Sequence, residues 1–159
     1  MKRTALLLAA PLALFPLLAG CSTNPSSMTV HGTVTFTSVN GTPPAQAFPD
    51  VQANLAPPSP GPGGITYVPP LQVNITADDG PGNYSGQPWR EVETDMTLKS
   101  ATAKVITYTF TAQVPDDAVM YQVDTVCCTQ TPGGDNFTVE EMQAGPALCF
   151  GGGCPPGSG

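Results

Sequence analysis

Apolar and polar residues alternate along most of this chain with a period of two, the pattern of β-strands that bury one face. Threonine, glutamine and acidic residues fill the polar positions. Turn-forming Gly, Pro, Asn and Asp separate the alternating runs. We therefore expect an all-β fold: a single antiparallel β-sandwich of about seven strands. The expected strands cover residues 30–37, 51–55, 71–77, 92–98, 106–111 and 119–123, with a short edge strand over 65–68.

The apolar sides of these strands predict the core. We expect the following side chains to be largely buried: Phe36, Val73, Ile75, Tyr108, Phe110 and Tyr121. Residues 137–143 are ambiguous. Thr138-Val139-Glu140-Glu141 fits a helix capping box, with Gly145 as a stop, but the segment fits a last strand equally well.

The first twenty residues have a different character. Lys2 and Arg3 precede an apolar run over residues 5–19, which Pro11 and Pro16 interrupt. A positive start, a short apolar stretch and small residues at its end are the parts of an export signal. The run is shorter than the roughly 20 residues that a membrane-spanning helix needs.

The end of the run, Leu18-Ala19-Gly20-Cys21, resembles the lipobox of bacterial lipoproteins. The resemblance covers residues 1–21 only. It implies a diacylglycerol thioether on Cys21, cleavage before this residue, and acylation of the new amino group, commonly with palmitate. The protein is then expected in the cell envelope, bound to a membrane through its lipid. Ser22, in place of Asp, resembles lipoproteins sent to the outer membrane, if the cell has one; otherwise the outer face of the plasma membrane is expected.

Four regions follow from these patterns. We expect a lipoprotein signal peptide over 1–20, a lipidated tether over 21–27, a β-sandwich domain over 28–154 and a disordered tail over 155–159. Loss of Lys2 and Arg3 with the signal leaves three strong bases against twelve acids, so the formal charge moves from −7 to −9. Such a surface repels phosphate backbones, so nucleic acid is not an expected partner.

The opening third of the mature chain also resembles transthyretin-like and carboxypeptidase regulatory-like domains. The resemblance lies in Gly32-Thr33-Val34, Gly41-Thr42-Pro43 and Val51-Gln52-Ala53-Asn54-Leu55. It implies a noncatalytic seven-strand sandwich and says nothing of a ligand.

Four cysteines remain beside Cys21, and an even number in an exported chain predicts two disulfides. Neighbouring residues of a strand point to opposite faces, so Cys127 and Cys128 are not expected to bond each other. We expect each to bond Cys149 or Cys154, which would fasten the C-terminal segment to the strand. The alternative joins Cys127 to Cys128 and Cys149 to Cys154. A zinc site is disfavoured, because such sites usually have paired Cys-x-x-Cys knuckles.

No other group of residues forms a specific catalytic motif. His31, the single histidine, lies on the polar side of its strand, and no Gly-x-Ser-x-Gly is present. Met28 near His31 suggests copper, but the methionines do not cluster. Glu91, Glu93 and Asp95 are expected on a solvated strand face. Weak calcium candidates lie in two acidic turns: Asp78, Asp79, Asp116 and Asp117.

These features favour a membrane-anchored envelope lipoprotein whose noncatalytic sandwich is a binding or structural module. No cofactor is expected; an envelope protein or a glycan is a candidate partner. The alternative is a small envelope enzyme, or a protein that handles calcium or copper through its acidic loops or cysteines. Convergence of His31 with the acidic turns in one pocket would favour this alternative.

Overall fold

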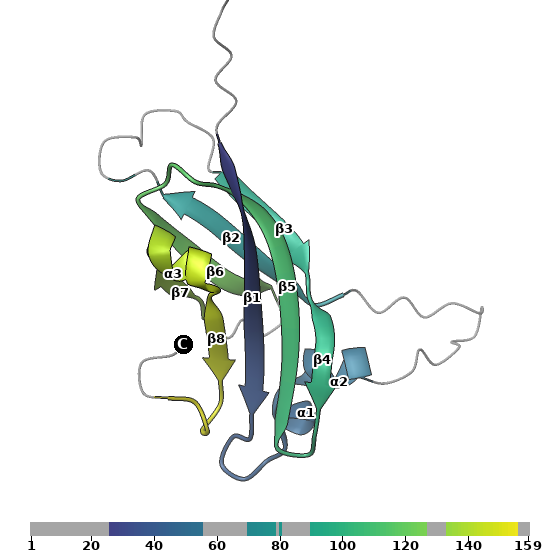
Figure 1. Ribbon diagram of the computed structural model, residues 1–159. Coiled ribbons are helices and arrows are strands. Elements are labelled where there is room, and N and C mark those ends of the chain that lie inside the picture. The colour runs from purple at the N-terminus through teal and green to yellow at the C-terminus, as the bar shows by residue number, and fades with distance from the viewer. Residues whose placement is uncertain (1–25, 56–69, 79, 81–89, 127–132, 156–159) are drawn as a thin grey trace, which may run out of the picture.

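The computed structural model describes residues 26–55, 70–78, 80, 90–126 and 133–155. These residues form two four-stranded sheets packed face to face, with short helices at their edges (Figure 1). The strand orders are β4-β5-β1-β8 and β3-β2-β6-β7, and the chain is therefore an all-β sandwich, as predicted. The elements are β1 (Ser27–Thr37), α1 (Pro44–Ala47), α2 (Pro49–Leu55), β2 (Gln72–Asp78), β3 (Arg90–Asp95), β4 (Thr97–Ala101), β5 (Val105–Pro115), β6 (Met120–Val126), β7 (Asp135–Phe137), α3 (Val139–Ala144) and β8 (Ala147–Phe150).

The strands β1 and β5 form the longest pairing. They run antiparallel along their whole lengths, from Ser27 opposite Pro115 to Thr37 opposite Val105. β8 pairs with the other edge of β1 and is parallel to it, which the prediction of a purely antiparallel sandwich did not include. The first strand begins at Ser27, so the last residue of the expected tether is already part of the sheet.

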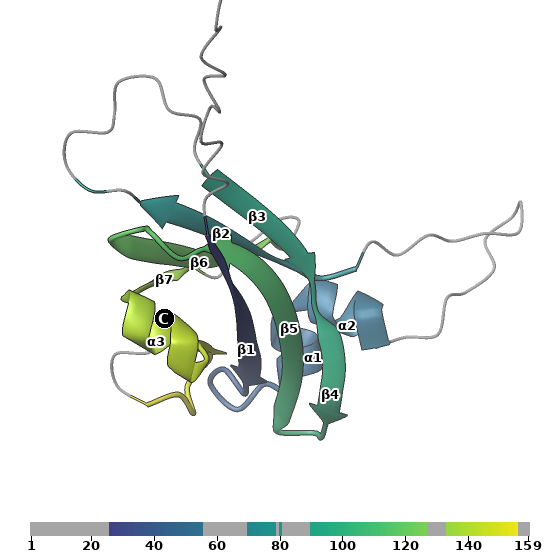
Figure 2. The same cartoon turned by 45° about the horizontal axis from the view of Figure 1, so that its top comes forward.

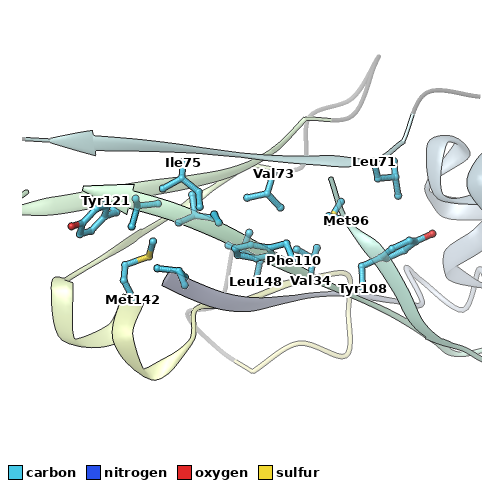
Figure 3. Close-up of a cluster of buried hydrophobic side chains, with 14 of the residues drawn as sticks. Val34, Leu71, Val73, Ile75, Met96, Tyr108, Phe110, Tyr121, Met142 and Leu148 are labelled. Carbon is cyan, nitrogen blue, oxygen red and sulfur yellow. The ribbon is translucent and has the colours of Figure 1, made fainter. Parts of the chain in front are cut away.

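The core lies between the two sheets, and its side chains come from both (Figure 3). All six aromatic and aliphatic residues predicted to be buried are buried, and none is more than 3% exposed. Phe110 of β5 lies directly over Gly32 of β1, where a Cβ atom would overlap the aromatic ring. Gly32 therefore leaves the space that this ring occupies.

The segment 51–55 is helical, so the prediction of a strand there was wrong. Pro44 and Pro49 stand at the starts of α1 and α2, where their fixed φ favours a first helical turn and no backbone N–H is needed. Within α2, Val51 is buried and Leu55 partly buried. Their spacing of four residues fits a helix face as well as every second position of a strand. The second strand of the transthyretin-like resemblance is thus a helix here.

The expected strand over 92–98 is two strands that belong to different sheets. β3 pairs with β2 as far as Asp95, and β4 then pairs with β5. Met96 occupies the corner between them, where its N–H donates to the Leu71 carbonyl at 2.7 Å. Leu98, beyond the corner, is 46% exposed rather than buried. The edge strand expected over 65–68 lies outside the described residues.

The ambiguous segment near Thr138 is a helix. The Thr138 hydroxyl accepts the Glu141 N–H at 3.3 Å, and the Glu141 carboxylate accepts the Thr138 N–H at 2.8 Å. These two bonds complete the capping box. The Glu141 carboxylate accepts hydrogen bonds from both the N–H and the hydroxyl of Thr138, which lowers the pKa of Glu141. α3 buries Met142 and lies beside β1, β6 and β7, whereas α1 and α2 lie near β4 and β5 (Figure 2). The helices thus close opposite edges of the sandwich.

Removal of the Phe110 ring should be strongly destabilising. Phe110→Ala should lower the free energy of unfolding by about 3–5 kcal/mol, the usual cost of deleting a buried aromatic side chain. Gly32→Ala should also destabilise, because its Cβ displaces the ring. In the Phe110→Ala background, however, Gly32→Ala should cost little, since the new methyl group fills vacated space. Urea unfolding of the four proteins measures this coupling; strictly additive losses would contradict the described contact.

Candidate functional site

The lipidation candidate Cys21 lies outside the described residues, but the place where the chain joins the fold is defined. The Ser26 hydroxyl donates to the Asp116 carboxylate, and the Asp116 N–H donates to the Ser26 carbonyl at 3.1 Å. The first described residue is therefore fixed to the connection between β5 and β6. We call this part of the molecule the anchor end (upper end in Figure 1).

Further polar contacts hold the β5–β6 connection at the anchor end. Arg90 donates to Asp117, and this hydrogen bond lowers the pKa of the Asp117 carboxyl. The Tyr121 hydroxyl donates to the Pro115 carbonyl, and burial raises the pKa of Tyr121. The Val119 N–H donates to the Asp78 carbonyl at 2.8 Å, which joins the connection to the end of β2. The connection is thus bonded to the residue before β1, to the end of β2 and to the start of β3.

The acidic turns come together at the anchor end, but their carboxylates have separate partners. Asp78 accepts the N–H of Gly80 at 2.8 Å, Asp116 accepts the Ser26 hydroxyl and Asp117 accepts Arg90. Asp79 lies outside the described residues. Among the residues that the structure describes, no three His, Cys, Asp or Glu side chains are grouped as they would be around a metal ion.

His31 lies apart from these carboxylates, on the outer face of the β4-β5-β1-β8 sheet. It is exposed, and its Nδ1 lies 3.0 Å from the Thr111 hydroxyl. Met28 packs against the core and therefore faces the opposite side of β1. The two candidate copper ligands point away from each other, so the structure does not bring them together. Among the described residues, His31 is likewise not grouped with the carboxylates of the acidic turns.

The outer face of the β3-β2-β6-β7 sheet is rich in acceptors, and we call it the acidic face. Strand pairing sets Glu93 and Asp124 on either side of Asn74. The carboxamide of Gln72 donates to Asp95 at 3.0 Å, and that of Asn74 donates to Glu91. The described residues of this face include no lysine or arginine. Its polar members are Gln72, Asn74, Thr76, Asp78, Glu91, Glu93, Asp95, Gln122, Asp124 and Asn136.

The opposite sheet presents a different surface. Along β1 and β5 the outward positions are mostly threonines, which pair across the strands. Their exposed neighbours also bond one another, as when Gln113 donates to the Thr29 hydroxyl at 2.6 Å. The charged carboxylates are therefore concentrated on one of the two broad faces. The outward threonines are Thr29, Thr33, Thr35, Thr107, Thr109 and Thr111.

The preferred disulfide pairing was wrong for the C-terminal cysteines, because Cys149 and Cys154 bond each other. Cys149 is on β8, whose partner is β1 of one sheet, whereas Cys127 and Cys128 follow β6 of the other. The glycines after Phe150 turn the chain back, so that the Cα atoms of Cys149 and Cys154 lie 5.6 Å apart. Cys127 and Cys128 themselves lie outside the described residues. The disulfide therefore closes a loop within the C-terminal segment and, contrary to the prediction, does not fasten that segment to β6.

Thr37, which sequence reasoning missed, holds this disulfide loop to the sandwich. Its buried hydroxyl accepts the Gly153 N–H at 3.0 Å and donates to the Phe150 carbonyl at 3.2 Å. At Gly151, φ is +114°, and a Cβ atom would overlap the Thr37 carbonyl. A threonine at a strand end gives no sequence signal for this role, since its partners come from the far end of the chain.

Opening the disulfide should have a moderate effect on stability. Its short loop predicts a loss of about 2 kcal/mol for Cys149→Ser/Cys154→Ser, by chain entropy. The hydrogen bonds of Thr37 should keep the loop in place, so the fold should survive. Urea unfolding tests the loss, with Thr37→Val as a comparison that removes the hydroxyl instead.

Nonreducing peptide mapping should find Cys149 joined to Cys154; a link from either to Cys127 or Cys128 would contradict this pairing.

None of the helices in the described residues is long and apolar enough to cross a membrane. Comparisons of the chain with protein-family models, curated proteins and solved structures found no match. The features that bear on function are therefore taken from the chain itself: the lipobox-like sequence over residues 18–21, the attachment of Ser26 at the anchor end, and the acidic face.

Proposed function

We propose that this protein is a lipid-anchored lipoprotein of the cell envelope whose sandwich is a noncatalytic binding module. The observation that carries this proposal is the attachment of Ser26 to Asp116, five residues after Cys21. A lipid on Cys21 would hold one end of the sandwich beside the membrane. Both broad sheet faces would then stand free of the attachment point.

The length of the tether supports this arrangement. Five residues span at most about 18 Å when fully extended. The anchor end would therefore remain near the lipid headgroups. Because β1 runs away from Ser26, its far end and the Cys149–Cys154 loop would point away from the membrane (Figure 1).

The acidic face is the surface that we propose for the partner. Hydrogen bonds between neighbouring strands hold the side chains of Gln72 and Asn74 against Asp95 and Glu91, so these groups lose little conformational freedom when a partner binds. The carboxylates of Glu93 and Asp124 accept hydrogen bonds and carry negative charge. They match a partner that supplies donors and positive charge, such as a basic protein surface in the envelope. A glycan, whose hydroxyl groups also donate, is the other candidate.

Anchoring predicts that Cys21→Ser will abolish incorporation of labelled fatty acid and leave the precursor uncleaved by the lipoprotein peptidase. Metabolic labelling and gel mobility measure both effects. Cys154→Ser is the matched control, because it removes a different cysteine, one that is part of the disulfide, and should leave labelling unchanged. A Cys21→Ser protein that still carries lipid and partitions into detergent like the wild type would overturn the anchoring proposal.

The partner proposal predicts contact at the centre of the acidic face. A photo-crosslinking residue at position 93 of the full chain should give a discrete adduct in intact cells, and high salt should weaken it by screening. The same residue at position 140 is the control, since Glu140 is an exposed glutamate on α3. Adduct digestion distinguishes a protein from a glycan. Equal amounts of adduct at both positions, or no adduct at position 93, would exclude the acidic face as the binding surface.

A further inference from the structure

Two neighbouring apolar side chains are exposed at the anchor end. Val119 is 61% exposed and Met120 is 40% exposed, at the start of β6. Val119 is the most exposed large hydrophobic residue that the structure describes. Single exposed apolar residues need no explanation, whereas contiguous ones mark surfaces that a protein or a membrane covers.

The backbone around this pair is held rather than loose. The Val119 N–H donates to Asp78, and Met120 is paired with Asp78 across β2 and β6. The Gly80 backbone passes close to Val119, because a Cβ atom at Gly80 would lie 3.3 Å from its side chain. The fold thus keeps the two side chains exposed at a fixed place.

The same connection holds the start of the chain. Asp116, three residues before Val119, bonds both the backbone and the side chain of Ser26. If Cys21 is lipidated, its lipid lies within about 18 Å of Ser26, the extended length of five residues. The exposed pair is therefore on the part of the sandwich that the tether holds nearest the bilayer.

We infer that Val119 and Met120 contact the lipid surface and form a second attachment beside the lipid on Cys21. This inference rests on the proposed anchoring. The nearby carboxylates of Asp116 and Asp117 are bound to Ser26 and Arg90, but they still disfavour anionic headgroups. The contact should consequently be stronger on zwitterionic than on anionic vesicles.

Tryptophan substitution tests the contact in the lipidated full chain. Trp89→Phe removes the single natural tryptophan, and Val119→Trp then introduces a probe. On phosphatidylcholine vesicles with brominated acyl chains, its fluorescence should be quenched several-fold more than that of Leu98→Trp. Leu98 is a matched control, since it is 46% exposed and lies on β4 near the opposite end (Figure 1). Phosphatidylglycerol vesicles should reduce the quenching.

The outcomes separate the two proposals. Flotation with the vesicles but equal quenching at both positions would overturn the surface contact and leave anchoring intact. No flotation would overturn anchoring and the contact with it. A second measurement needs no substitution: a photoactivatable acyl chain in the vesicles should label the wild-type peptide that contains Val119 and Met120. Labelling confined to other peptides would likewise overturn the contact.

Discussion

The strands β1 and β5 pair over their full lengths, and both ends of the molecule depend on this pairing. At its first residue, β1 continues from Ser26, which is bonded to the residue that follows β5. At its last residue, the Thr37 hydroxyl accepts the Gly153 N–H of the C-terminal disulfide loop. The close approach at its middle needs Gly32, because only a residue without a side chain leaves room for Phe110. One strand therefore links the attachment point, the core and the far end.

The sequence predicted those parts of the fold that depend on local alternation. Val73 and Ile75 face the core because β2 is apolar on one side only, and the same holds for Tyr108 and Phe110 of β5. Alternation does not reveal which sheet a strand joins, so the change of sheet at Met96 was missed. Nor does it separate a short helix from a strand when only Val51 and Leu55 face inward.

The candidate surfaces were harder to predict than the core. Glu91, Glu93 and Asp95 were correctly placed outside, since they alternate with inward residues on β3. They lie beside Asn74 and Asp124 only because β3, β2 and β6 are neighbours in one sheet, and no local sequence pattern predicts that strand order. The Cys149–Cys154 bond depends instead on the turn after Phe150, which brings the two Cα atoms to 5.6 Å, and strand alternation does not predict that turn.

The lipid and the exposed pair would have unequal roles. Full burial of a valine or a methionine side chain contributes about 1.5–3 kcal/mol. Val119 and Met120 are only partly exposed, so on their own they would bind a membrane weakly. A millimolar affinity already requires about 4 kcal/mol. Once a lipid holds Ser26 close, however, the contact becomes intramolecular and its effective concentration is high. The lipid would thus supply the attachment, while Val119 and Met120 would determine which way the acidic face is turned.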